Sequence, residues 1–298
     1  MKSKMNILIY RPIRLRELGC AAALLLMNVG LAADIRIEKD VAYLGSERAE
    51  KADLYLPATG GQGERYPAVV IMHGGGWTYG DKGSALEKNI GTTLAKNGYV
   101  GMSINYLLDS KDLASTPWPR NLSDCKTAVR WLRLNAAKLN VDPDHIGAIG
   151  GSAGGHLAVM LAVTGPDAGL DPKGPYGDFS CQIQAAVDLY GPMAWFLNRD
   201  VRMLHLKRTE APELYRQATP MTYVDKSDPP ILILQGDADK TVDVTDSQLL
   251  DAALTKAGVE HQLVIIPGAG HSFDLQPKQR DLRPMVLGFF DRYLKAPK

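Results

Sequence analysis

A serine between glycines is the residue of this chain best suited to covalent chemistry. Ser152 stands in Gly150-Gly151-Ser152-Ala153-Gly154, between the apolar run 145–149 and an amphipathic run that begins at His156. Glycine permits the unusual backbone angles of a sharp turn and the close approach of a strand to a helix. In such a turn the hydroxyl is exposed beside the free N–H groups of a helix N-terminus. The pattern G-x-S-x-G predicts a nucleophile turn; a glycine-rich turn with an incidental serine is the alternative.

A serine hydroxyl needs a base to take its proton, and a histidine base works best when an acid orients it. His271 follows one strand-like run, and Asp237 and Asp239 follow the run before it. We therefore assign His271 as the base and Asp239 as the acid that orients it. We expect Asp237 to hydrogen-bond its own turn. Packing or surface roles are expected for the remaining histidines downstream of the glycine loop: His145, His156, His205 and His261.

A run of glycines offers backbone hydrogen-bond donors that could stabilise an oxyanion. His73-Gly74-Gly75-Gly76 follows the apolar run 66–72 directly. Attack on an ester carbonyl places negative charge on its oxygen, and backbone N–H groups can approach that oxygen closely only where side chains are absent. The amide of Ala153 adds a further donor. The alternatives are a flexible turn and a phosphate cradle, but the glycine patterns of nucleotide-binding loops are absent.

The elements that must position these residues alternate along the chain. Strands are expected at 35–38, 52–56, 66–72, 99–106, 145–149, 185–190, 231–235 and 262–266. Helices are expected at 84–97, 121–140, 154–163, 244–257 and 279–294. Ser84 and Glu87 predict a capping box at the start of the first helix. We expect a turn at 141–144 and a short helical insertion between residues 191 and 228.

This alternation predicts an α/β fold with a mainly parallel central sheet and helices on both faces. The first two strands are expected to form an antiparallel edge. Ligands of such sheets bind at the carboxyl ends of the strands. His73, Ser152, Asp239 and His271 each follow the carboxyl end of an expected strand. We therefore expect one shared site at that edge of the sheet.

The N-terminus has the pattern of a secretory signal peptide. Basic residues in the first sixteen positions precede the apolar run 18–29, which ends in Gly30-Leu31-Ala32. The small residues indicate cleavage after Ala32 or one residue later, so that residues 1–32 are the signal peptide and 33–298 the catalytic domain. An uncleaved anchor is the alternative, although the run is short for a membrane span. The prediction is export to the periplasm or the extracellular space. There Cys125 and Cys181 either pair or remain buried free thiols.

Composition excludes several classes of partner. Apolar residues make up 45% of the chain, charged residues 22%, and the net charge is +1. These are ordinary values for a globular domain with a sizeable core. They predict no nucleic-acid partner and no stable membrane association after removal of the signal. Neither an H-E-x-x-H motif nor a cysteine cluster occurs, so we expect no metal and no cofactor. The oligomeric state stays open.

Several of these motifs together resemble those of the α/β-hydrolase esterases with an HGGG loop. The chain is similar to the feruloyl and acetyl-xylan esterase-like (BD-FAE-like) branch, near the hormone-sensitive-lipase-like group. The resemblance covers about residues 50–294 and rests on these segments: 73–77, 80–82, 103–106, 124–133, 150–157, 235–242 and 270–271. One departure is Gln235, where this family often has histidine. The departure falls on a structural position and leaves the catalytic residues in place.

The resemblance implies a role for each matched residue. It implies Ser152 as nucleophile, His271 as base and Asp239 as orienting acid. It also implies oxyanion donors on Gly75, Gly76 and Ala153 and a loop-shaping role for His73. The implied function is a serine carboxylesterase that forms an acyl-enzyme with small-molecule or carbohydrate esters. Short-chain or aromatic acyl groups, such as acetyl or feruloyl groups of plant polysaccharide, are the implied substrates.

Two questions stay open at this point. The same residues suit an amidase or peptidase, and the same fold can serve as a catalytically silent binding protein. The insertion is too short for a large cap, which predicts an open cleft. Aromatic side chains stack on sugar and aromatic rings, so Trp77, Trp118 and Trp195 are candidate substrate-binding residues. Ordinary packing is the alternative for each and is the expectation for Trp131.

Overall fold

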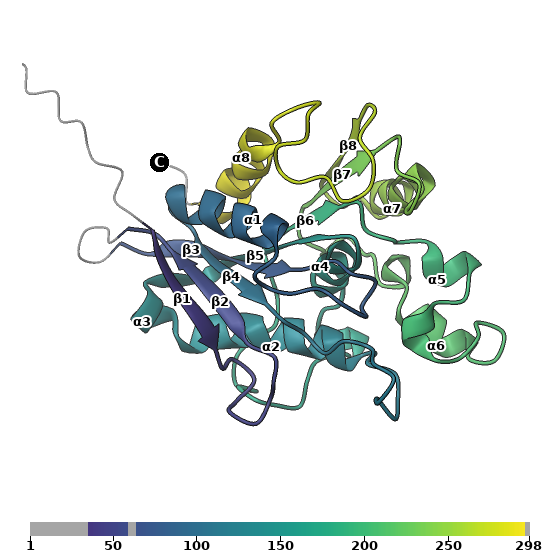
Figure 1. The fold of residues 1–298 in the computed structure, drawn as a ribbon, viewed down its shortest axis with the longest axis horizontal. Coiled ribbons are helices and arrows are strands. Elements are labelled where there is room, and N and C mark those ends of the chain that lie inside the picture. Colours follow the sequence, from purple (N-terminus) through teal and green to yellow (C-terminus); the bar gives the residue numbers. More distant parts are fainter. Residues whose placement is uncertain (1–34, 59–63, 296–298) are drawn as a thin grey trace, which may run out of the picture. The chain divides into compact units, whose positions relative to one another are not determined.

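The computed structural model describes residues 35–58 and 64–295, all of which fall in one compact unit (Figure 1). Eight strands form one sheet in the order β1-β2-β4-β3-β5-β6-β7-β8. Their bounds are β1 Arg36–Val41, β2 Ala52–Leu56, β3 Tyr66–Met72, β4 Val100–Ile104, β5 Val141–Gly151, β6 Ala185–Leu189, β7 Ile231–Gly236 and β8 His261–Ile266. Strand β2 pairs antiparallel with both β1 and β4, and all other neighbours are parallel. The expected mainly parallel sheet is confirmed. The predicted signal peptide lies outside the described residues.

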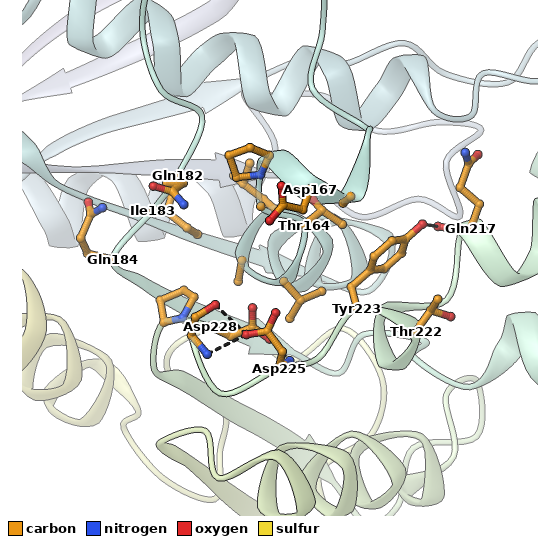
Figure 2. A pocket seen from close by; sticks show the side chains of 18 of the residues that line it. Thr164, Asp167, Gln182, Ile183, Gln184, Gln217, Thr222, Tyr223, Asp225 and Asp228 are labelled. Atoms are coloured by element: carbon orange, nitrogen blue, oxygen red, sulfur yellow. Dashed lines mark hydrogen bonds between the residues drawn. The ribbon is translucent and has the colours of Figure 1, made fainter.

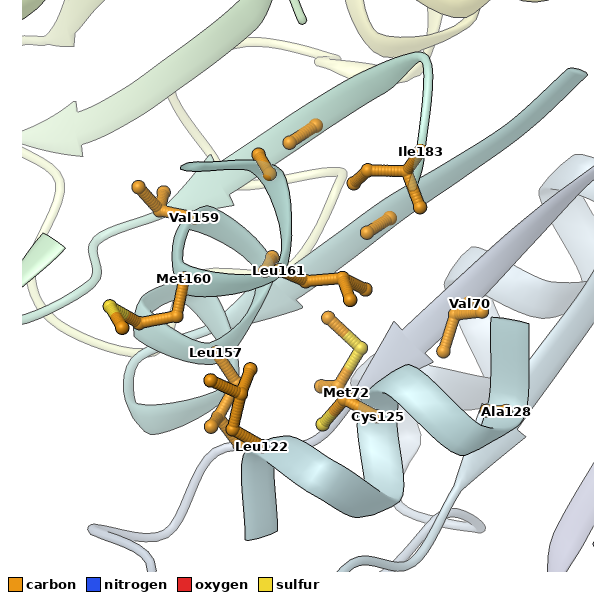
Figure 3. Packing of buried hydrophobic residues seen from close by; sticks show 14 of the residues in the cluster. Val70, Met72, Leu122, Cys125, Ala128, Leu157, Val159, Met160, Leu161 and Ile183 are labelled. Carbon is orange, nitrogen blue, oxygen red and sulfur yellow. The ribbon is translucent and has the colours of Figure 1, made fainter. Parts of the chain in front are cut away.

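Helices cover both faces of the sheet, as Figure 1 shows. Helices α1 (Ala85–Lys96) and α8 (Arg283–Leu294) pack on one face. Helix α1 contacts β3, where Val69 and Ile71 point to this face, and α8 contacts β5 and β6. Helices α2 (Arg120–Leu134), α4 (Ala153–Val163) and α7 (Val244–Ala257) pack on the other face, where Val70 and Met72 point. Figure 3 shows this second core, with Met72 among side chains of α2 and α4. The continuous apolar strands follow from this burial on two sides.

Two local predictions were wrong. The helix expected at 121–140 is two helices, α2 and α3 (Ala136–Leu139), which are separated at Asn135. Both the backbone amide and the side-chain amide of Asn135 donate to the Trp131 carbonyl there, a local side-chain bond that favours a helix end. The turn expected at 141–144 lies within β5. Its ladder is interrupted there, since Tyr66 pairs with Val141 and Ala68 with Ile146. Residues 142–145 therefore form a bulge inside the strand.

The segment between β6 and β7 is a short helical insertion, as expected. It holds α5 (Trp195–Asn198), α6 (Pro212–Gln217) and the 3-10 turns Arg202–Leu204 (η2) and Pro220–Thr222 (η3), and a further 3-10 turn, Pro166–Ala168 (η1), follows α4. Cys125 and Cys181 are both buried free thiols. In the ranges 35–58 and 64–295, no helix is long and apolar enough to cross a membrane.

Candidate active site

The turn at Ser152 joins β5 to α4 under backbone strain. Ser152 has φ 55° and ψ −120°, a conformation that costs roughly 1–3 kcal/mol for a residue with a side chain. Its amide donates to the Leu189 carbonyl of the neighbouring strand at 2.8 Å, which fixes the turn to the sheet. A Cβ on Gly154 would overlap the carbonyl oxygen of Met72. Glycine therefore lets α4 approach the end of β3, from which the glycine loop departs.

Three side chains from separate strand ends form a continuous hydrogen-bonded chain. Ser152 Oγ lies 3.0 Å from His271 Nε2. His271 Nδ1 lies 2.7 Å from Asp239 Oδ2. With Nδ1 donating to the carboxylate, Nε2 carries the lone pair that accepts the serine proton. The structure thus brings together the serine, the base and the acid that the sequence predicts.

Backbone and side-chain groups hold the acid in place. The Asp239 side chain is fully buried, and its Oδ1 accepts hydrogen bonds from the amides of Thr241 and Val242. Its Oδ2 lies 3.3 Å from Gln235 Nε2, which also donates to the carbonyls of Gly236 and Val242. Gln235 thus contacts the acid directly, a positioning role that its place on a buried strand did not reveal in the sequence.

Asp237 has a different role from Asp239. Its Oδ1 accepts a hydrogen bond of 2.6 Å from the amide of Gly268, in the loop that carries His271. The carboxylate was expected to bond its own turn, but it bridges to the next loop instead. Asp237 is exposed, and the carboxylate hydrogen-bonded to the His271 ring is that of Asp239. This geometry separates the two carboxylates, with Asp239 alone in reach of the base.

The glycine loop presents free amides to the same space. Gly75 and Gly76 have φ of 109° and 58°, backbone angles that glycine adopts without steric cost. No group in the described part of the chain accepts a hydrogen bond from the amides of Gly75, Gly76 or Ala153. All three residues line the pocket that contains Ser152. Their amides match the donors expected for a developing oxyanion.

His73 shapes this loop from within the protein. Its ring is buried, and burial lowers the pKa of the imidazole. Nδ1 lies 2.7 Å from the Gly74 carbonyl, and the ring stacks on Tyr106 at 4.4 Å. The Tyr106 hydroxyl donates to the His73 carbonyl. A neutral, buried ring with these contacts agrees with the loop-shaping role that the resemblance implies.

The pocket at the triad has a volume of about 450 Å³. Trp77 and Trp195 line it, but Trp77 is only 1% exposed and packs against His156 and Phe196. The prediction that Trp118 lines the cleft is wrong. Trp118 is buried in the core, where its indole N–H donates to Gln217 Oε1 at 3.0 Å. Its place before α2 directs the ring under the insertion.

The pocket also contains residues that the sequence did not single out for binding. Leu86 and Glu87 of α1 and Tyr190 after β6 contribute to its wall. The capping box expected at the start of α1 is absent, because Ser84 makes no side-chain cap bond. Only the burial of Glu87 marks it as unusual, and the amphipathic pattern of the helix does not reveal that burial.

A roomier hollow lies at the other end of α4. It has a volume of about 920 Å³ and is lined by residues 161–168 and by parts of the segment 213–230. Figure 2 shows polar side chains around it, among them Asp167, Tyr223 and Asp228. The eleven residues of α4 place this hollow about 16 Å from Ser152. It contains no serine–histidine pair, so we take the smaller pocket as the active site.

The histidines outside the active site also have specific partners, and His261 Nδ1 lies 2.8 Å from the Val259 carbonyl oxygen. His205 Nε2 lies 2.6 Å from Asp109 Oδ1, so it ties the insertion to the loop after β4. The Asp109 amide in turn donates to the Trp77 carbonyl. Elsewhere in the described residues, no group of three or more His, Cys, Asp or Glu side chains is arranged to hold a metal ion.

Solved structures of known proteins have a similar fold. The structure of a truncated carbohydrate esterase from gut microbiota has a TM-score of 0.78 and 28% identity, and the match covers 88% of this chain and 97% of that one. Thermogutta terrifontis esterase 2, phosphorylated by paraoxon, has a TM-score of 0.70 at 28% identity, covering 90% and 97% of the two chains. The fold is therefore that of the α/β-hydrolases.

Sequence comparison assigns the family. Esterase LipQ of Mycobacterium tuberculosis is 32% identical over 249 residues, which is 79% of this chain and 57% of LipQ. Esterase LipC of the same organism is 30% identical over 70% of this chain and 53% of its own length. The chain thus spans just over half the length of these curated relatives. A family model described as BD-FAE matches residues 52–254, which include the nucleophile turn and Asp239. With the HGGG loop and both of these site segments inside the matched region, the chain belongs to the BD-FAE family.

Proposed function

We propose that this protein is a serine carboxylic-ester hydrolase that forms an acyl-enzyme on Ser152. The observation that carries the proposal is the unbroken hydrogen-bonded chain from Asp239 through His271 to the Ser152 hydroxyl. The free amides of the glycine loop beside it supply the second requirement of acyl transfer. The esterases among the solved structures with this fold support the same conclusion.

The mechanism follows from the geometry. Ser152 Oγ attacks the ester carbonyl carbon while His271 Nε2 takes its proton. The Asp239 carboxylate accepts the hydrogen bond of Nδ1–H, and so it orients the ring and stabilises the imidazolium that forms. The tetrahedral oxyanion accepts hydrogen bonds from the amides of Gly75, Gly76 and Ala153, each worth roughly 3–4 kcal/mol where one donor has been removed from such a site. The intermediate collapses when the C–O bond breaks and His271 protonates the alcohol. Water then repeats the sequence on the acyl-enzyme and restores Ser152.

Small or flat acyl groups fit the pocket best. Its volume of about 450 Å³ is at the low end for ligand sites. The half-buried ring of Trp195 lines it and suits ring stacking, whereas Trp77 is packed within the wall. We therefore propose short-chain or aromatic acyl esters, with acetyl or feruloyl groups on plant polysaccharide as the natural class. An acyl-chain series run beside acetylated xylan and methyl ferulate tests this choice.

Hydrolysis of p-nitrophenyl acetate by the wild type and by Ser152→Ala tests the activity. We expect turnover in the wild type and a loss of at least about 10³-fold in the variant. The amide p-nitroacetanilide, run in parallel, separates an esterase from an amidase. An inactive wild type or equal rates in the two proteins would refute the proposal and favour a silent binding protein on this fold.

We also propose that the protein is exported, as the N-terminal pattern of residues 1–32 indicates. Expression of the full chain in a Gram-negative host followed by cell fractionation tests this. The expected product lies in the periplasm or medium and begins at Ala33 or one residue later. A cytoplasmic product that keeps residues 1–32 would contradict export.

A further inference from the structure

A carboxyl group without a partner lies in the wall of the active-site pocket. Glu87, in the first turn of α1, is 3% exposed and lines the same pocket as Ser152 and His271. It forms no ion pair, and within residues 35–58 and 64–295 no group other than its own amide donates a hydrogen bond to its carboxyl. Buried carboxyl groups are ordinarily paired. An unpaired one in a pocket is therefore a candidate binding group.

The helix does not account for this carboxyl. In a capping box, Glu87 would bond the backbone amide of Ser84. That amide donates instead to the Asp81 carbonyl, at 3.0 Å. No side chain caps the helix. Capping of α1 therefore does not explain why the Glu87 carboxyl is buried.

Three tyrosines are close enough to interact electrostatically with Glu87: Tyr55, Tyr106 and Tyr190. In the described residues, no hydrogen bond joins any of their hydroxyl groups to its carboxyl. The Tyr106 hydroxyl donates to the His73 carbonyl, and the Tyr190 hydroxyl donates to the Phe273 carbonyl. Neither proton is available to Glu87. The side of Glu87 that lines the pocket is where a substrate group can supply the hydrogen-bonding partner.

The chemical state of the group selects the kind of partner. Burial, with a smaller contribution from the negative Asp81, raises the pKa of Glu87 to about 7. With a pKa near 7 the carboxyl is partly protonated at neutral pH, and its uncharged form can both accept and donate a hydrogen bond. A hydroxyl group also accepts and donates. The match therefore favours a hydroxyl over an ammonium group.

We propose that Glu87 is a specificity-determining residue whose carboxyl hydrogen-bonds a hydroxyl group of the ester substrate. This inference rests on the proposed esterase function. The hydroxyl can belong to a sugar alcohol that carries the acyl group or to an aromatic acyl group with a phenol. Both sources supply the same chemistry, and the experiment separates them.

Paired substrates test the role of Glu87. The alcohol pair is methyl xyloside monoacetate and cyclohexyl acetate, and the acyl pair is methyl ferulate and methyl cinnamate. The measured quantity is the ratio of kcat/KM for the hydroxylated ester to that for its partner. In Glu87→Met, which keeps the length and removes both hydrogen-bonding atoms, we expect this ratio to fall about 2- to 10-fold in one pair, the range for a hydrogen bond between uncharged groups.

Two further variants control the comparison. Glu87→Gln keeps an acceptor and a donor, so we expect it to restore most of the ratio. Glu38→Gln removes a carboxylate from the exposed edge strand β1 and should leave every rate unchanged. Thermal unfolding checks each variant, and Glu87→Met should melt no lower than the wild type, since no partner is lost.

The outcomes are distinct. A fall in the alcohol pair assigns a sugar hydroxyl, and a fall in the acyl pair assigns a phenol. Unchanged ratios in both pairs, with an active wild type, would overturn the role of Glu87 and leave the esterase proposal intact. Acetylthiocholine, an ester of a cationic thiol, is assayed as a third substrate. A loss of kcat/KM in Glu87→Met on this ester alone would overturn the role in favour of a cation site. An inactive wild type would refute the esterase proposal itself.

Discussion

Replacing Gly75 or Gly76 by alanine separates two properties of the glycine loop: its positive φ angles and its close approach to Tyr79. Both residues have positive φ, 109° and 58° respectively. A Cβ on Gly75 would overlap the carbonyl oxygen of Tyr79, whose amide donates back to the Gly75 carbonyl at 3.2 Å. A Cβ on Gly76 would meet nothing within 4 Å. The two substitutions therefore share the conformational cost, and only Gly75→Ala adds a collision with backbone.

The expected losses of stability and of kcat follow from this difference between the two glycines. A left-handed backbone costs an L-residue about 1–2 kcal/mol, so Gly76→Ala should lower the unfolding free energy by that amount and leave the loop in place. Gly75→Ala must move the loop by a large fraction of an ångström, which misplaces at least one oxyanion donor. Loss of one donor lowers kcat by roughly 10²–10³-fold. We expect that loss for Gly75→Ala and less than about a tenfold loss for Gly76→Ala.

The assay is kcat and KM for p-nitrophenyl acetate beside thermal unfolding of each variant. Circular dichroism confirms that both variants are folded at the assay temperature. The predicted pattern is a kcat effect in Gly75→Ala that exceeds its stability effect. Equal activity in the two variants, or a larger loss in Gly76→Ala, would refute the role assigned to the close approach of Gly75 and Tyr79.

Three further predictions concern the acid, the core and pH. Asp239→Asn should lower kcat by about 10⁴-fold, as for other triad acids, whereas Asp237→Asn should mainly lower the melting temperature; the reverse ranking would overturn the assignment. Trp118→Phe should leave kcat/KM within about threefold and lower the unfolding free energy by about 1 kcal/mol, because the hydrogen bond to Gln217 is lost. A large loss of kcat/KM with normal stability would instead indicate that Trp118 contacts the substrate. Burial lowers the pKa of His156 to about 4, so folding keeps its ring neutral and stability is lost as pH falls from the unfolded value near 6.5 toward 4. From pH 7 to pH 5, wild type should lose about 2 kcal/mol more unfolding free energy than His156→Gln, as measured by urea denaturation, and parallel losses would contradict this.

Much of the site follows from sequence because its parts lie at strand ends. The strands β3, β5, β7 and β8 are marked by apolar runs, and each is followed at once by a glycine-rich or acidic loop. Parallel strands bring their carboxyl ends to one edge of a sheet. Ser152, Asp239 and His271 could therefore be assigned before their distances were known. Each loop carries its own sequence motif, and the parallel sheet brings the loops together in space.

Features that depend on side-chain packing could not be predicted in this way. Trp118 lies between prolines in a polar segment and Trp195 lies in the apolar segment 192–197, yet it is Trp195 that lines the pocket. Glu87 fits a capping pattern, and its burial depends on how α1 packs against β2 and β4. Asp237 fits a local turn, but the spacing of two loops decides that it bonds Gly268. Each of these results from contacts distant in sequence, which periodicity and motif do not record.

The central claim is that Ser152 is the nucleophile, activated through His271. Intact-mass and peptide mass spectrometry after reaction with paraoxon tests it most directly, because a phosphoryl adduct marks the activated serine itself. We predict one diethylphosphoryl group on the peptide that contains Ser152, with loss of esterase activity at the same rate. We predict no adduct in Ser152→Ala and much slower labelling in His271→Ala. An adduct on another residue, or equal labelling of wild type and Ser152→Ala, would contradict the account.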